Sequence, residues 1–350
     1  MTEPSYSASD PPAPSGQGGA GTRRADLVME AGGVKGLAFA GAVYELTRAG
    51  YTFPRVAGTS SGAVSGAILA ALQRAGESPE RLLDIAKTMD LPKFRDSAGG
   101  GHLGPFHFVA EGATFVLEGG IYQGKYLHDW VSGVLADLGV HAFGDLRRTD
   151  TGSGLPSDRD YSFVAVTSDI SEHRMVLLPW DYAYYGLDPD EQLVADAVRA
   201  SAAIPFFYVP STMATRTPRG TVSLVDGGLL SMYPITIFDQ PRQVPARWPT
   251  FGIRLSAHED ARAADHPIHH PLGIAIALIE TMLEGWDNRH IDNPSAIART
   301  MFADTGAISG LDFDLTTEQR TQLIDAGRQA ARTFLATWDF DRWRAAFHPA

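Results

Sequence analysis

Ser60 lies between two glycines, Gly58 and Gly62, in the pattern Gly-x-Ser-x-Gly. The mostly apolar residues 51–57 before it predict a strand, and the small, apolar residues 63–72 after it predict a buried helix. A serine on so sharp a strand-to-helix turn has a strained backbone, and glycine on either side leaves room for it. The helix that follows points its N-terminal amides at the serine and favours negative charge there. We therefore interpret Ser60 as a nucleophile for acyl transfer rather than as part of an ordinary Gly-Ser turn.

A second glycine cluster, Gly32 and Gly33, lies between a predicted strand at 26–30 and a predicted helix at 37–46. Glycine lets the backbone come close to a ligand and leaves its N–H groups exposed, as an oxyanion hole requires. Lys35 would add positive charge near a phosphate or a developing oxyanion. The cluster therefore fits a loop that stabilises the negative charge of an acyl-transfer intermediate.

A strand, glycines and a helix in this order also open a dinucleotide-binding site. Here Ala31 breaks the G-x-G-x-x-G pattern, and no acidic residue follows at a strand end about twenty residues later. A tight turn that only allows close helix packing is the remaining alternative. The residues of the loop alone leave that alternative open.

A third motif, Asp226 followed by Gly227 and Gly228, comes directly after the apolar stretch 221–225. An aspartate that leaves a strand into two glycines has no bulky neighbours and can face a cleft. By itself the motif is a common turn signal. It gains meaning from the order along the chain, which is a glycine loop, a serine elbow and then a strand-end aspartate.

With these three motifs the chain resembles the patatin-like phospholipase family over roughly residues 24–340. The motifs that carry the resemblance are Gly32-Gly33-Val34-Lys35-Gly36, Gly58-x-Ser60-x-Gly62 and Asp226-Gly227-Gly228. Smaller similarities occur around Gly120, around Ala200-Ser201 and around residues 311–315. The resemblance implies a three-layer α/β/α fold with a mostly parallel central sheet, related to but distinct from the α/β-hydrolase arrangement.

The same resemblance implies a Ser–Asp dyad in place of a catalytic triad. Ser60 would be the nucleophile, Asp226 its base, and the amides of Gly32 and Gly33 the oxyanion hole. A further implication is that no cofactor or metal takes part.

Two positions depart from the family pattern. Ala31 stands where the family loop usually opens with a third glycine, which would narrow the oxyanion hole slightly. The asparagine that often follows the Asp-Gly-Gly motif is replaced near residues 231–233.

A Ser-His-Asp triad is the mechanistic alternative, and it would place a histidine late in the chain. The late histidines are His258, His266, His269, His270, His290 and His348. They lie in polar or proline-containing stretches, and none follows a clear strand in a short loop. A dyad in turn requires either an aspartate whose pKa rises from about 3.9 toward neutrality or a proton transfer that is coupled tightly to the attack, and a partly dry cleft would help.

Composition excludes several functional classes. The 350 residues carry a formal net charge of −12, which argues against a nucleic-acid partner and against simple electrostatic docking on anionic membranes. The absence of cysteine rules out disulfides, thiol nucleophiles and cysteine zinc sites. No set of acidic or cysteine residues completes a metal site with the histidines at 266–270. The expected partner is an acyl-lipid or ester substrate, with a membrane surface as a further candidate.

The chain divides into a tail and one large domain. Residues 1–22 are rich in Pro, Ser, Gly and Ala and predict a disordered tail, and residues 23–350 are expected to form a single catalytic domain. The Gly- and Phe-rich residues 91–120 would form either a lid or acyl-binding wall, or a packed surface loop. The C-terminal aromatics at 338–347 are expected to pack on the domain rather than to contact lipid. Without a signal peptide or a membrane-spanning stretch we expect a cytoplasmic protein, with leaderless export left open.

Alternating strands and helices place the motifs in a mostly parallel sheet covered by helices. The predicted strands are 26–30, 53–58, 161–168, 221–225, 250–255 and 298–303, and the predicted helices are 36–49, 62–75, 78–89, 125–138, 189–202, 271–288 and 316–337. The motifs then lie at carboxyl ends of strands, where open α/β sheets build their sites.

The sequence as a whole is interpreted as that of a serine lipid acyl hydrolase acting on phospholipids or other acyl lipids. A soluble carboxylesterase or thioesterase with the same dyad, and a non-catalytic binding protein of the same fold, are the two alternatives.

Overall fold

The computed structural model describes residues 23–96, 119–148, 155–240, 247–255, 278 and 293–347. The predicted tail, most of the predicted lid segment, nearly all of the predicted helix at 271–288 and the six late histidines lie outside these residues. The predictions for those segments therefore stay predictions.

The central sheet contains eight strands in the order β12-β11-β2-β4-β6-β10-β9, and β7 pairs with β6. Its strands are β2 (Asp26–Met29), β4 (Val56–Thr59), β6 (Phe163–Asp169), β7 (Arg174–Leu178), β9 (Ser211–Ala214), β10 (Thr221–Asp226), β11 (Thr250–Arg254) and β12 (Thr300–Phe302). From β12 to β6 all pairings are parallel, whereas β7, β9 and β10 add antiparallel strands. Two small parallel pairs complete the strands, β1 (Arg23–Arg24) with β3 (Tyr51–Thr52) and β5 (Gly120–Tyr122) with β8 (Phe206–Tyr208).

Strands β4 and β10 share one edge of β6. Along residues 165–169 the other edge of β6 is occupied by β7. Thr59, the last residue of β4, pairs with Val166, and Asp226, the last residue of β10, pairs with the next residue, Thr167. Because β10 runs antiparallel to β6, the two strands meet with their carboxyl ends facing each other.

The helices of the described residues are α1 (Leu37–Arg48), α2 (Ser61–Arg74), α3 (Arg81–Thr88), α5 (Lys125–Asp137), α6 (Val194–Ser201), α8 (Pro294–Ile297), α9 (Thr317–Thr337) and α10 (Phe340–Phe347). Short 3-10 helices are η1 (Gly33–Gly36), η2 (Leu91–Phe94), η4 (Phe143–Leu146), η5 (Ser157–Arg159), η6 (Tyr182–Tyr185), η7 (Pro189–Glu191) and η8 (Gly227–Leu229). Among the helices for which coordinates are described, none has the length and hydrophobicity to cross a membrane.

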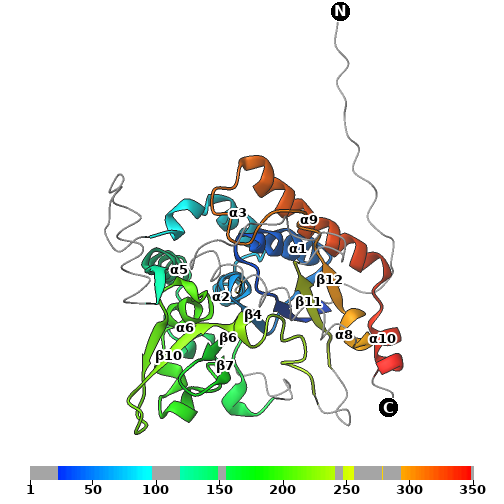
Figure 1. Cartoon of the computed structure of the whole chain (residues 1–350). Helices are drawn as coiled ribbons and strands as arrows, with labels where there is room; N and C mark the ends of the chain where they lie inside the picture. The colour runs from blue at the N-terminus through cyan, green and yellow to red at the C-terminus, as the bar shows by residue number, and fades with distance from the viewer. Residues whose placement is uncertain are drawn as a thin grey trace, which may run out of the picture.

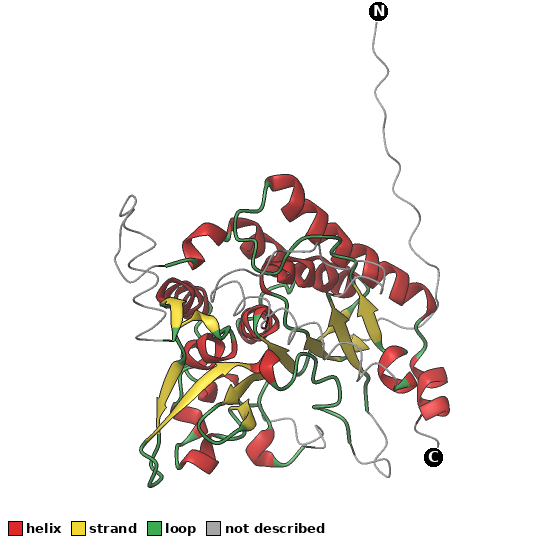
Figure 2. Ribbon diagram, in the orientation of Figure 1, coloured by secondary structure: helices red, strands yellow, loops and turns green. Residues whose placement is uncertain are grey.

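The sheet separates two layers of apolar contacts. Leu27 and Met29 belong to the large cluster formed with α1, α2 and α9, whereas Val28 belongs to a smaller cluster with Ile235 and Phe238 on the opposite face. This alternation is what a strand with two buried faces produces. Figure 1 shows α1 and α9 side by side above the sheet, and Figure 2 shows helices around the central strands. The predicted α/β class with a mostly parallel sheet flanked by helices is confirmed.

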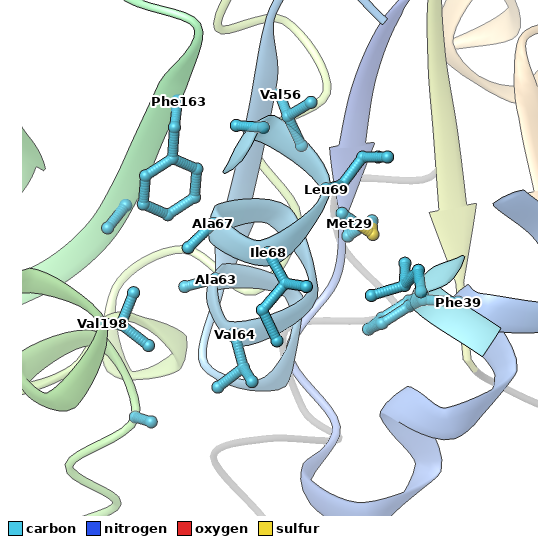
Figure 3. Close-up of a cluster of buried hydrophobic side chains, with 14 of the residues drawn as sticks. Met29, Phe39, Val56, Ala63, Val64, Ala67, Ile68, Leu69, Phe163 and Val198 are labelled. Atoms are coloured by element: carbon cyan, nitrogen blue, oxygen red, sulfur yellow. The ribbon is translucent and has the colours of Figure 1, made fainter. Parts of the chain in front are cut away.

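Helix α2 is buried along almost its entire length. Its small side chains allow neighbours to approach on several sides, as Figure 3 shows, with Phe163 and Val198 on one side and Met29 and Phe39 on the other. Ala67 is fully buried in this cluster. The helix that begins at Ser61 is therefore held rigidly against the strands, and so is the turn that precedes it.

Two predicted elements need correction. The strand predicted over 51–57 is divided into β3 and β4, because Pro54 has no N–H for a ladder and the Phe53 N–H donates to the Gln73 side chain instead (2.8 Å). The helix predicted from 189 begins at Val194, after a separate turn. Strands β5, β7, β8 and β9 were not predicted, since each is short and lacks a long alternating pattern.

The C-terminal aromatics pack on the domain, as expected. The Trp338 ring lies 5.1 Å from the ring of Phe251 and stacks on Phe334 at the same distance. Trp343 is only 5% exposed. Phe334 and Trp338 therefore pack against β11 through Phe251.

Candidate active site

Ser60 is placed on a strained turn between β4 and α2. Its backbone lies at φ 55° and ψ −119°, and it is one of three non-glycine residues with positive φ in the described part of the chain. A Cβ on Gly58 would lie 2.1 Å from the carbonyl oxygen of Gly62, so the turn closes only with glycine at that position. The predicted elbow is therefore present, and strain of this kind persists only where the surrounding structure holds it.

Asp226 ends β10 and is 1% exposed. Its Oδ1 accepts a hydrogen bond from the Gly228 N–H (2.7 Å), while Oδ2 is buried and has no hydrogen bond of good geometry to any described residue. Burial raises the pKa of Asp226 to about 7, and the neighbouring Ser60 hydroxyl and the Gly228 amide partly oppose this rise. An aspartate with this pKa can accept a proton near neutral pH.

Close packing explains the glycine that follows the aspartate. A Cβ on Gly227 would lie 2.2 Å from the carbonyl oxygen of Val166 and 2.9 Å from the Thr59 side chain. The turn after Asp226 therefore passes directly over the end of β4. Thr59 adds a hydrogen bond from its hydroxyl to the Ser231 carbonyl (3.0 Å), which ties the end of β4 to the segment after the turn.

The glycine loop lies beside the elbow. Gly33 has φ 56°, and a Cβ there would lie 2.0 Å from the Gly310 carbonyl oxygen. The Val34 N–H donates to that same carbonyl (2.9 Å), and the Lys35 N–H donates to the Gly32 carbonyl (3.2 Å). In contrast, the amides of Gly32 and Gly33 donate no hydrogen bond within the described ranges. They are thus available to a ligand, as an oxyanion hole requires.

A buried ion pair supports this loop from behind. Glu30, the residue after β2, accepts hydrogen bonds from Arg254 Nε (2.9 Å) and from the Leu255 N–H (2.6 Å). The Leu255 side chain in turn lies against Gly32, where a Cβ would be 2.5 Å from Leu255 Cδ1. The loop is therefore fixed to β11, and its amides keep one orientation.

Ala31, the departure from the family pattern, is buried, and its N–H donates to the Met232 carbonyl (3.1 Å). Because the Ala31 amide makes this hydrogen bond, it is not a free donor as the amides of Gly32 and Gly33 are. The alanine therefore removes no donor from the loop.

An apolar cavity of about 80 Å³ opens beside Ser60. Helix α3 and η2 form one wall, and α1, α2 and the residues after α6 form the others. The lining residues are Gly33, Val34, Gly36, Leu37, Ala40, Ser60, Ser61, Val64, Ser65, Ile68, Leu82, Ile85, Ala86, Met89, Leu91, Phe94, Leu127, Ala202, Ile204, Tyr208 and Phe313. No charged side chain is among them, and the Tyr208 hydroxyl is already engaged with the Phe94 carbonyl (2.9 Å). Such a cavity suits an alkyl chain.

The remaining predicted residues lie apart from this cavity. Lys35 is half-buried, does not line the cavity and forms no ion pair with the residues described, so its role near an oxyanion stays a prediction. His128, His141 and His173, the histidines with described positions, do not line it either. Within the described part of the chain, no group of His, Asp and Glu could hold a metal ion.

Two features of the site were not predicted from the sequence. The first is the α3 wall, whose apolar residues repeat at helical spacing as in any core-facing helix. The second is the end of α6, where Ser201 contacts the Ser60 backbone and Ala203 contacts that of Asp226. The only signal for the second was the weak similarity around Ala200-Ser201.

Comparison with known proteins finds one similar sequence and several similar structures. The protein YqhO of Bacillus subtilis, itself uncharacterized, is 32% identical over 319 residues, which cover 90% of this chain and 99% of YqhO. The crystal structure of VipD from Legionella pneumophila is similar at 16% identity and a TM-score of 0.49, covering 89% of this chain and 67% of VipD. ExoU of Pseudomonas aeruginosa, in its complex with SpcU, is similar at 16% identity and a TM-score of 0.44, covering 90% of this chain and 52% of that one.

The present chain thus spans about half the length of ExoU. The model of the family described as patatin-like phospholipase matches residues 27–239, from β2 to just beyond the Asp-Gly-Gly turn. The matched range contains the glycine loop, the elbow and Asp226. The chain belongs to the patatin-like phospholipase family.

Proposed function

We propose that this protein is a serine lipid acyl hydrolase in which Ser60 and Asp226 form a catalytic dyad. The observation that carries the proposal is a buried aspartate with a pKa of about 7 next to a strained serine at an apolar cavity. Family membership supports hydrolysis of lipid acyl esters in general.

The first half of the reaction forms an acyl-enzyme. Asp226 takes the proton of the Ser60 hydroxyl while Ser60 Oγ attacks the ester carbonyl. Negative charge develops on the carbonyl oxygen, where the free amides of Gly32 and Gly33 would donate to it. Collapse of the tetrahedral intermediate breaks the bond to the alcohol, which leaves with the proton that Asp226 returns.

The second half consumes water. Asp226 removes a proton from a water molecule, the hydroxide attacks the acyl carbon, and the proton returns to Ser60 Oγ as the carboxylic acid leaves. Besides the ester itself, both halves use only Ser60, Asp226, the loop amides and water.

The apolar lining supports an acyl chain as the part of the substrate that the cavity binds. A carboxylesterase or thioesterase with the same dyad is the second candidate. It is favoured by one observation, which is that the described lining offers no cation for a phosphate head group.

One experiment tests the proposal and separates the candidates. A fluorophosphonate should label the protein, and mass spectrometry should place the adduct on Ser60. Fatty acid release from phosphatidylcholine vesicles, compared with turnover of p-nitrophenyl butyrate, then distinguishes a phospholipase from a simple esterase. Absence of both labelling and turnover would leave a non-catalytic binding protein and refute the proposal.

A further inference from the structure

The C-terminal end of α6 contacts the backbone of both proposed dyad residues. Ser201, the last residue of the helix, is 0% exposed, and its Oγ accepts a hydrogen bond from the Ser60 N–H (3.0 Å). Two residues later, the Ala203 carbonyl accepts a hydrogen bond from the Asp226 N–H (2.8 Å). A segment of three residues thus holds the nucleophile and the base by their amides.

The Ser201 hydroxyl occupies the point where the ladder between β4 and β6 ends. The last pair of that ladder is Thr59 with Val166. Ser201 Oγ donates to the Val166 carbonyl (2.6 Å) while it accepts from Ser60, so the hydroxyl bridges the two strands just beyond their last pair. A buried amide without an acceptor would be costly, and no other acceptor for the Ser60 N–H is found in the described structure.

Because the backbone of Ser60 is strained, the hydrogen bond from its N–H to Ser201 matters for keeping Ser60 in place. A non-glycine residue at φ 55° relaxes unless neighbouring groups hold it. Helix α2 holds the C-terminal side of Ser60, whereas the Ser201 hydroxyl is the contact that holds its N–H. Ala202 and Ile204, on either side of Ala203, also line the cavity, so the same segment forms part of the wall for the acyl chain.

We propose that Ser201 is a positioning residue for the reaction, which fixes Ser60 Oγ at the distance from Asp226 that proton transfer requires. This inference rests on the proposed function. Removal of the hydroxyl leaves the Ser60 N–H without an acceptor and lets the elbow relax away from Asp226. A displacement of about 1 Å at a reacting group lowers the rate by roughly 100-fold.

The test compares Ser201→Ala with Ser168→Ala. Ser168 lies in β6, is also 0% exposed, and its Oγ has no hydrogen-bond partner within the described residues. Both changes delete one buried hydroxyl, but only the first deletes a contact with Ser60. We expect Ser201→Ala to lower kcat for p-nitrophenyl butyrate by about 10- to 100-fold with little change in KM, and Ser168→Ala to match wild type.

A third variant, Ser201→Thr, keeps the hydroxyl and should restore most of kcat. Equal kcat values for folded Ser201→Ala and Ser168→Ala would overturn the inference. So would a Ser201→Thr protein that is folded but as slow as Ser201→Ala.

Hydrogen exchange gives a readout that does not depend on activity. In the wild-type protein the Ser60 amide should exchange slowly, and Ser201→Ala should speed its exchange while Ser168→Ala leaves it unchanged. Fast exchange at Ser60 in wild type would refute the positioning role, even if Ser201→Ala failed to fold. An inactive wild type with a protected Ser60 amide would refute the proposed function and leave the bridge confirmed.

Discussion

Ser60 and Asp226 lie at the facing ends of two strands that share one edge of β6. Thr59, just before Ser60, pairs with Val166, and Asp226 pairs with the adjacent Thr167. The two side chains are thus brought to the same level of the sheet by hydrogen-bond register, although their strands run in opposite directions. A ladder of this kind fixes their separation more firmly than two loops would.

The nucleophile assignment predicts that Ser60→Ala abolishes activity. Because alanine removes only the hydroxyl, the fold should be retained, and kcat should fall by about 10³-fold or more. Ester turnover and fluorophosphonate labelling measure the effect, with Ser168→Ala as the control for deleting a buried hydroxyl. Labelling that persists, or an adduct on Ser61 or Ser65, would contradict the assignment.

The base assignment predicts that Asp226→Asn is as inactive as Ser60→Ala. The amide keeps the shape of the side chain but cannot accept a proton, and the double variant should be scarcely slower, since the two residues act as a unit. In wild type, kcat/KM should rise with pH through about 7 and level off above it, because the carboxylate must be unprotonated. Additive losses, or a pH profile flat through this range, would argue for another base.

The carboxyl group of Asp226 should also make stability depend on pH. Stability should fall as the pH rises, whereas kcat/KM should rise. The pKa of Asp226 in the folded protein, about 7, lies above the ordinary value of 3.8, so the unfolded chain releases this proton first. The free energy of unfolding therefore falls as pH rises from about 4 to 7. Asp226→Asn removes this penalty, and its gain over wild type should grow between pH 5 and pH 8 by ~2 kcal/mol. Denaturant unfolding at the two pH values measures it, and a constant difference would be inconsistent with a raised pKa.

The next prediction concerns Ala31, which stands where the family loop usually has a third glycine. Because the Ala31 N–H is engaged with Met232, Ala31→Gly should leave kcat close to that of wild type. It should lower stability by about 0.4–1 kcal/mol, since glycine gives the unfolded chain more freedom. Steady-state kinetics and thermal unfolding check the two effects. A large loss of kcat would mean that Ala31 shapes the oxyanion hole.

Gly33 is less suited to such a substitution test, because any Cβ there collides with the Gly310 carbonyl.

The cavity predicts chain-length selectivity. Ala86 of α3 lines the wall, and Ala86→Leu would add three carbons at the space for the acyl chain. Each displaced methylene removes about 0.8 kcal/mol of burial, so kcat/KM for an octanoate ester should fall by roughly tenfold or more. An acetate ester has only a methyl group beyond its carbonyl, and its hydrolysis should match that of wild type. Equal losses on both esters would indicate a folding defect, and no loss on either would place the acyl chain elsewhere.

Local patterns predicted the elements that carry the site. The elbow, the glycine loop and the end of β10 each depend on residues that are adjacent in sequence, and glycine reports close backbone approach directly. The direction of β10 could not be predicted, because strand pairing depends on contacts between distant segments. The α3 wall was missed since apolar residues at helical spacing look the same whether they face a core or a cavity. Ser201 stands in an alanine-rich helix and gave no sign that its hydroxyl bridges two strands.

The carboxyl ends of β4 and β10 face each other, and this arrangement also has a consequence for the order of folding. The elbow and its helix belong to the first strands of the parallel sheet, whereas β10 follows the β6–β7 hairpin much later in the chain. Contacts between segments so far apart in sequence close late, because chain closure over a long loop is entropically costly. A nascent chain that has folded only its first strands therefore has Ser60, but neither Ser201, which holds the Ser60 amide, nor the base Asp226. Hydrolytic activity should for this reason appear only after β10 has paired with β6.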